Sequence, residues 1–133
     1  MRYRLAACAI LLLSACESTP ITPMQGQGDT LNLTPEERRL WYSATELEQQ
    51  LEKAGYLYEE AALQAYLEAV MLRLSPEYAG AISVRVVDSP SLKAFALPNG
   101  SIYINTGMLS RLENEAQVAT ILAHEGVHFT HKH

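Results

Sequence analysis

The chain has 133 residues, of which 48% are hydrophobic and 19% are charged, and its formal net charge is −5. This length suits one domain with a modest hydrophobic core. Acidic residues outnumber basic ones, and no basic patch is interleaved with aromatic residues, so we expect no nucleic-acid partner.

The first sixteen residues, MRYRLAACAILLLSAC, are typical of an export signal. Arg2 and Arg4 precede an uncharged apolar run from Leu5 to Leu13. A membrane-spanning helix needs roughly twenty apolar residues, and this run is about half as long. We therefore expect a signal peptide rather than a membrane-spanning helix.

The tetrapeptide Leu13-Ser14-Ala15-Cys16 resembles the bacterial lipobox, whose cysteine becomes the lipidated first residue of the mature protein. The resemblance implies lipidation at Cys16 and contact with a membrane through the lipid anchor. Because Glu17 rather than an aspartate follows, it also implies an outer-membrane location facing the periplasm. The alternative is an ordinary cleaved signal with a chance cysteine.

The segment after this cysteine differs in composition from the rest of the chain. Residues 17–33, ESTPITPMQGQGDTLNL, are rich in Thr, Pro, Gly and Gln and hold few large apolar side chains. Such a composition is typical of a solvated linker. We therefore divide the chain into a lipoprotein signal peptide (1–16), a flexible tether (17–33) and a folded region (34–133).

Two helices are predicted at the start of the folded region. The first, near 35–54, has Thr34 as its N-cap, Glu37 in the capping-box position and Gly55 beyond its end. The second, near 58–74, follows from apolar residues at three- and four-residue spacing. Its expected buried face consists of Leu63, Tyr66, Leu67, Val70, Met71 and Leu74.

The next segments change to a period of two, which predicts strands. AISVRVVD, from residue 81, alternates apolar with polar side chains and indicates a strand with one buried face. KAFALPNGSIYINTG predicts two short strands joined at Pro98-Asn99-Gly100, because Asn-Gly tolerates the backbone angles of a tight hairpin. A final helix, with Asn114 as its N-cap, is expected to run to the last residue.

All four histidines of the protein lie on this final helix, in the stretch AHEGVHFTHKH. His124 and His128 are one turn apart, so both imidazoles can reach one metal ion. Neutral imidazole suits zinc, and the carboxylate of Glu125 beside it can accept a proton from metal-bound water. The His-Glu-x-x-His pattern therefore predicts zinc-peptidase chemistry. A polar helix end with solvated histidines is the alternative.

The stretch from 58 to 133, with its motifs KAFALPNGSIYIN and AHEGVH, resembles the HtpX-like and CAAX-prenyl-protease-like zinc metallopeptidases, metallopeptidase family forty-eight, particularly their exported lipoprotein branch. The resemblance implies an α+β, zincin-like (gluzincin) peptidase domain that is incomplete. Its parts are two N-terminal helices, a small sheet with a hairpin, and the helix that carries the motif. By matching position, His124 and His128 are ligands of one Zn²⁺ and Glu125 is the general base.

The same resemblance implies strands beside the cleft at Ala94-Phe95-Ala96-Leu97-Pro98 and at Ile102-Tyr103-Ile104, with substrate peptide paired against such an edge. We take Ile102, Tyr103 and Ile104 as the substrate-edge strand. The family takes its third zinc ligand, a glutamate, from a later helix, and no residue here matches it. His131 lies about 10 Å along the helix axis from His124, so it can join the site only if the helix end unwinds. His131 and His133 are otherwise exposed terminal histidines.

These observations leave three functional hypotheses. The first is a zinc-dependent metalloendopeptidase for quality control in the bacterial cell envelope, acting on unfolded or misassembled envelope proteins. The second is that the chain, truncated before the third zinc ligand, is a catalytically inactive lipid-anchored fragment or a binding or chaperone-like module. The third is a structural lipoprotein whose histidines buffer metal. For the chain itself we expect weak zinc binding and no cleavage.

Overall fold

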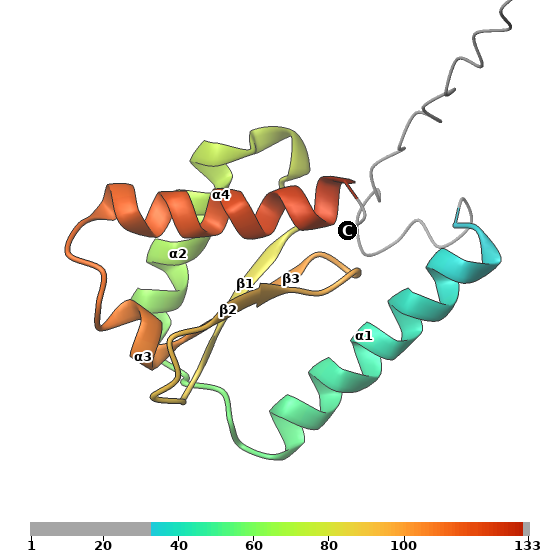
Figure 1. Cartoon of the computed structure of the whole chain (residues 1–133), viewed down its shortest axis with the longest axis horizontal. Coiled ribbons are helices and arrows are strands. Elements are labelled where there is room, and N and C mark those ends of the chain that lie inside the picture. The colour runs from blue at the N-terminus through green and yellow to red at the C-terminus, as the bar shows by residue number, and fades with distance from the viewer. Residues whose placement is uncertain (1–32, 132–133) are drawn as a thin grey trace, which may run out of the picture.

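The computed structural model describes residues 33–131 and their side chains as far as residue 130. Cys16, the predicted signal peptide and all but the last residue of the predicted tether lie outside this part of the chain. In chain order (Figure 1) the elements are helices α1 (Pro35–Lys53) and α2 (Ala61–Leu74), a 3-10 turn (Pro76–Tyr78), strands β1 (Ser83–Val87), β2 (Ala94–Ala96) and β3 (Ser101–Asn105), and helices α3 (Thr106–Leu109) and α4 (Glu115–His131).

Both predicted N-terminal helices are confirmed, with one change of boundary. The capping box of α1 is formed, since the Thr34 hydroxyl accepts from the Glu37 amide and the Glu37 carboxylate accepts from the Thr34 amide. Helix α2 begins at Ala61 rather than at residue 58. The reason is that the Tyr58 amide donates to the Val86 carbonyl at 2.9 Å, which holds the preceding segment extended beside β1.

The three strands form one sheet in the order β1-β3-β2, with β1 parallel and β2 antiparallel to β3. The predicted hairpin between β2 and β3 is confirmed. Its turn closes through the Gly100 amide, which donates to the Leu97 carbonyl at 3.0 Å, and Gly100 has a φ of 89°. Glycine reaches this left-handed region without the steric cost of a side chain. The α+β class is therefore confirmed.

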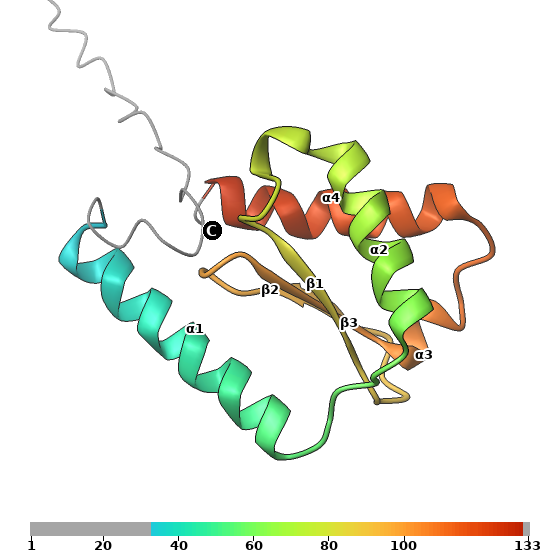
Figure 2. The ribbon, with the colours of Figure 1, turned by 180° about the vertical axis from the view of Figure 1, so that it is seen from behind.

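Strand β3 is buried on both faces because its side chains alternate between two cores. Ile102 and Ile104, both 0% exposed, pack with residues of α2 and α4. Tyr103, also 0% exposed, packs on the other face with Ala44 of α1. Seen from behind, α2 and α4 cross one another on one side of the strands (Figure 2). The sheet thus lies between α1 and the α2–α4 pair.

The prediction that Ile102, Tyr103 and Ile104 form a substrate edge is wrong, because β3 is the central strand of the sheet. The outer side of β1 is partly covered by a bridge between Leu57 and Val87. The open edge among the described residues is therefore β2. The sequence did not predict this central position because β2 lies between β1 and β3 in the chain. The alternating pattern of a strand shows which of its side chains are buried but not which strands pair with it.

The side chain of Tyr103 is stacked on Phe95 at a centroid distance of 5.2 Å. Burial raises the pKa of the Tyr103 phenol, and the nearby Glu48 carboxylate raises this pKa further. The folded state therefore holds the phenolic proton to a higher pH than the unfolded chain does. The resulting stability is present below the unfolded pKa of about 10 and is lost as the pH rises above it.

We therefore expect the free energy of unfolding to fall as the pH is raised above about 10, and the Tyr103→Phe variant to lose this contribution to the pH dependence. Urea unfolding at pH values on both sides of about 10 measures the effect. Tyr42→Phe, which changes a tyrosine that is 55% exposed, is the control. An unchanged pH slope in the Tyr103→Phe variant contradicts the prediction.

Candidate metal centre

Helix α4 presents the His-Glu-x-x-His motif because its opposite side is anchored in the core. At its start the Asn114 side chain accepts from the Gln117 amide at 3.1 Å, as predicted for an N-cap. Leu122 is 0% exposed, and a Cβ on Gly126 would lie 3.0 Å from the terminal methyl of Met71, so α4 crosses α2 closely there. His124, on another side of the helix, is exposed.

The two histidines of the motif lie together. Their Nε2 atoms are 3.3 Å apart, and the rings are nearly perpendicular, with a centroid distance of 4.9 Å. Two nitrogen ligands at about 2.0–2.1 Å from a tetrahedral zinc ion are separated by about 3.3–3.4 Å. The positions of His124 and His128 therefore fit two ligands of a single zinc ion.

Glu125 is half-buried and lies on the helix between the histidine side and the buried side, since each residue advances by about 100°. Glu125 therefore lies next to the histidine side along the helix surface. Among the side chains that the structure describes, no group of three or more His, Cys, Asp or Glu gathers at one point. A catalytic zinc ordinarily has three protein ligands. The side chains of His131 and His133 lie outside the described part, so their role stays untested.

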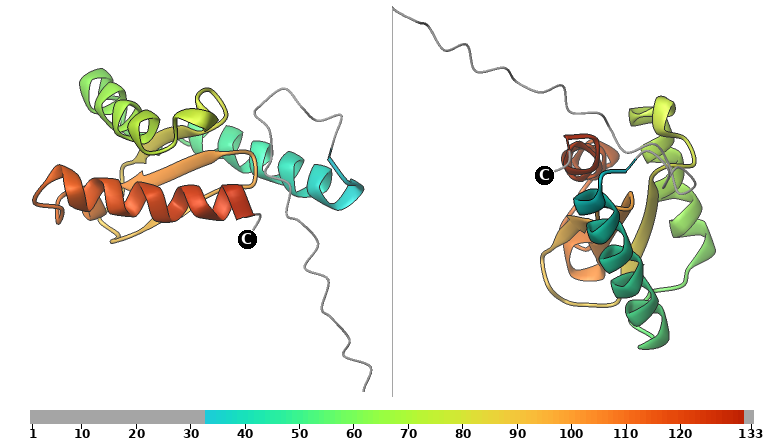
Figure 3. Two further views of the ribbon diagram at one scale, coloured as in Figure 1. Left: turned by 90° about the horizontal axis from the view of Figure 1, so that it is seen from above. Right: turned by 90° about the vertical axis from the view of Figure 1, so that its right-hand side faces the viewer.

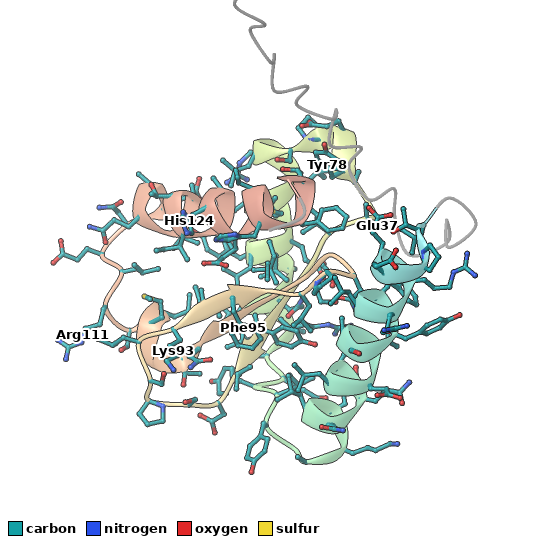
Figure 4. All side chains as sticks on the ribbon, turned by 45° about the vertical axis from the view of Figure 1, so that its right-hand side comes forward. Glu37, Tyr78, Lys93, Phe95, Arg111 and His124 are labelled. Atoms are coloured by element: carbon teal, nitrogen blue, oxygen red, sulfur yellow. The ribbon has the colours of Figure 1, made fainter. Side chains whose placement is uncertain are left out.

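Strand β2 supplies an open backbone edge beside this helix. The Lys93 carbonyl accepts from the Asn105 amide, and the Leu97 amide donates to the Ser101 carbonyl. Because these bonds alternate along an antiparallel pair, the amides and carbonyls of Ala94 and Ala96 point away from β3. The labelled Lys93, Phe95 and His124 in Figure 4 show how this strand lies beside α4.

The sequence also carries local signals that predict this edge. The apolar segment Ala94–Ala96 is only three residues long and is followed closely by Pro98. Short strands and nearby prolines are typical of sheet edges.

The chain matches Peptidase family M48 over residues 58–133. It is 31% identical over 122 residues, 85% of the chain, to the mitochondrial metalloendopeptidase OMA1 of Bos taurus, and 32% identical over 117 residues, 81% of the chain, to that of Homo sapiens. It is also 50% identical over 46 residues to OMA1 of Danio rerio. The chain spans 23%, 22% and 10% of the lengths of these three relatives.

The α+β fold, the His-Glu-x-x-His helix and these similarities agree with a domain of the metallopeptidase class. The chain belongs to peptidase family M48, since the family match covers more than half of its residues. The family predicted from the sequence is thereby confirmed.

The predicted location at the outer membrane is wrong. The curated relatives are named as mitochondrial metalloendopeptidases, not as outer-membrane lipoproteins. The prediction rested on the lipobox-like tetrapeptide that ends at Cys16 and on Glu17 after it, and such a short motif carries far less information than similarities extending over 117 or 122 residues. Within the described residues, no helix combines the length and hydropathy that crossing a membrane requires.

Proposed function

We propose that this chain carries the zinc-binding helix of a metalloendopeptidase that hydrolyses peptide bonds in unfolded or misassembled proteins. The 3.3 Å separation between the Nε2 atoms of His124 and His128 supports this proposal, because it fits two imidazoles on one tetrahedral ion. A zincin-like (gluzincin) architecture is part of the same proposal.

The proposed chemistry assigns one role to each residue of the motif. His124 and His128 would hold a zinc ion. A bound zinc ion lowers the pKa of its water ligand toward neutrality. The Glu125 carboxylate would accept a proton from the attacking water and pass it to the nitrogen of the leaving amine. A catalytic zinc site ordinarily has a third protein ligand, and the described side chains do not bring one to this pair.

The open edge of β2 supports the choice of substrate. The outward amides and carbonyls of Ala94 and Ala96 can form backbone hydrogen bonds with an added strand. A segment of an unfolded or misassembled protein can adopt the extended conformation that this pairing needs, whereas a folded helix or a paired strand cannot. We therefore place the substrate peptide along β2.

A second candidate function is peptide binding without hydrolysis, by a catalytically inactive module. It is favoured by one observation: within the described residues, only two metal-binding side chains come together. Two ligands hold zinc less tightly than three, and a loosely held ion activates little water.

Zinc titration of the full chain and an assay of casein hydrolysis distinguish these functions. Slow hydrolysis that is lost in Glu125→Gln, with zinc affinity retained, supports the peptidase. Casein binding without any hydrolysis in the presence of zinc supports the binding module. Glu46→Gln, which changes an exposed carboxylate on α1, is the control. Absence of zinc binding by the unmodified chain contradicts the proposed metal site.

The Ala96→Pro variant tests the peptide-binding edge. Proline removes one outward N–H without breaking a hydrogen bond to β3, so the fold is expected to survive. We expect the affinity for a fluorescently labelled, extended peptide to fall about fivefold or more, as measured by anisotropy. Phe95→Pro, which removes an N–H directed at β3, is expected instead to unfold the hairpin in circular dichroism. Unchanged peptide affinity in a folded Ala96→Pro variant contradicts the placement of substrate on β2.

A further inference from the structure

Helix α1 is held against the sheet by few apolar contacts. Ala44 is its buried residue, whereas Leu40 and Leu47 are 56% and 40% exposed. Viewed from above, much of α1 extends beyond the sheet (Figure 3). A helix that buries so little apolar surface gains little docking energy from it, so its polar contacts contribute a large share.

Glu48 makes the polar contacts that join α1 to the hairpin. Its Oε2 accepts from the Asn99 side-chain amide, and its Oε1 accepts from the Ser101 hydroxyl, each at 3.0 Å. Asn99 is 2% exposed and Ser101 is 0% exposed. Hydrogen bonds to a carboxylate are roughly twice as strong as neutral ones, and a buried donor without an acceptor is costly. One carboxylate on α1 thus satisfies two buried donors, one in the β2–β3 turn and one at the start of β3.

The β2–β3 turn that Glu48 holds also packs against α4. Gly100 lies between the two residues that Glu48 binds, and a Cβ at this position would lie 3.3 Å from the Phe129 ring. Phe129 is 3% exposed and also contacts Tyr78 edge-on at a centroid distance of 6.1 Å. Phe129 directly follows His128, so the ring anchors the helical turn that carries this histidine.

We propose that Glu48 is a positioning residue for the metal centre. By fixing the hairpin turn against Phe129, it holds the last turn of α4 in place and keeps His128 at metal-binding distance from His124. This inference rests on the proposed function of the histidine pair. The two hydrogen bonds of Glu48 join positions that are 51 and 53 residues apart in the sequence. Through them α1, which precedes the residues matched to the family, influences the geometry of the metal centre.

Hydrogen exchange of the metal-free full chain tests the contact path from α1 to α4. In Glu48→Ala we expect amide exchange about tenfold faster in two segments, the turn at 97–101 and the last turn of α4 at 126–131. Glu48→Gln keeps one acceptor oxygen and is expected to show a smaller acceleration in the same segments. Glu46→Ala, an exposed position on the same helix, is the matched control and is expected to match the unmodified chain.

Acceleration confined to α1, with the last turn of α4 unchanged, overturns the proposal. If Glu48→Ala does not fold, the exchange rates of Glu48→Gln in the same two segments are compared with those of the unmodified chain instead. Cobalt titration then separates this inference from the proposed function: cobalt affinity about tenfold lower in Glu48→Ala supports positioning, and unchanged affinity overturns it. Failure of the unmodified chain to bind cobalt contradicts the proposed function, whereas the metal-free exchange still decides whether Glu48 controls the last turn of α4.

Discussion

His128→Ala is expected to lower the zinc affinity of the chain at least about hundredfold. The structure brings only two metal-binding side chains together among the described residues, with Nε2 atoms 3.3 Å apart. Removing one of them leaves His124 as a single protein ligand, and one imidazole competes poorly with water for the ion. Competition with a chromophoric zinc chelator measures the affinity, and circular dichroism shows that the helix is retained.

The other two histidines of the chain provide the control for this experiment. The double variant His131→Ala and His133→Ala is expected to bind zinc as the unmodified chain does, because helical geometry separates His131 from His124 by about 10 Å. An equal loss of affinity in the two experiments contradicts the assignment of the metal to His124 and His128. A loss confined to the double variant places the metal at the terminal histidines instead.

The elements that the sequence predicted correctly are those with local signals. The capping box at Thr34 and Glu37, the Pro-Asn-Gly turn and the N-cap at Asn114 each lie within four residues of the element that they begin or end. The histidine pair was predictable for the same reason, since a spacing of four residues on a helix fixes the separation of two side chains.

Contacts between distant segments were not predictable from the same signals. Periodicity placed Tyr66 and Leu74 on the buried face of α2, yet each is 38% exposed, because α2 packs through the narrower stripe Leu67, Val70 and Met71. The central position of β3 depends on its parallel pairing with β1, and neither strand encodes its partner. The bond from Glu48 to the hairpin has no local signal at all, since it spans more than fifty positions.

Gly100→Ala is expected to lower the free energy of unfolding by at least about 3 kcal/mol. Two costs add at this position. The φ of 89° is one that an L-residue with a Cβ rarely adopts. The added Cβ would also lie 2.2 Å from the Ala81 carbonyl oxygen, which is part of the backbone and cannot rotate away as a side chain can. Urea unfolding measures the loss.

Gly80→Ala separates these two costs. Gly80 has a similar φ of 78°, but a Cβ there would meet nothing within 4 Å, so only the backbone cost of about 1–2 kcal/mol is expected. Equal losses in the two variants contradict the steric part of the prediction. A larger loss at Gly100 shows that the turn cannot move away from Ala81, because such a movement also breaks the bond from the Ser83 amide to the Gly100 carbonyl. The turn that Glu48 binds is then rigid enough to transmit the position of α1 to Phe129 and the adjacent histidine.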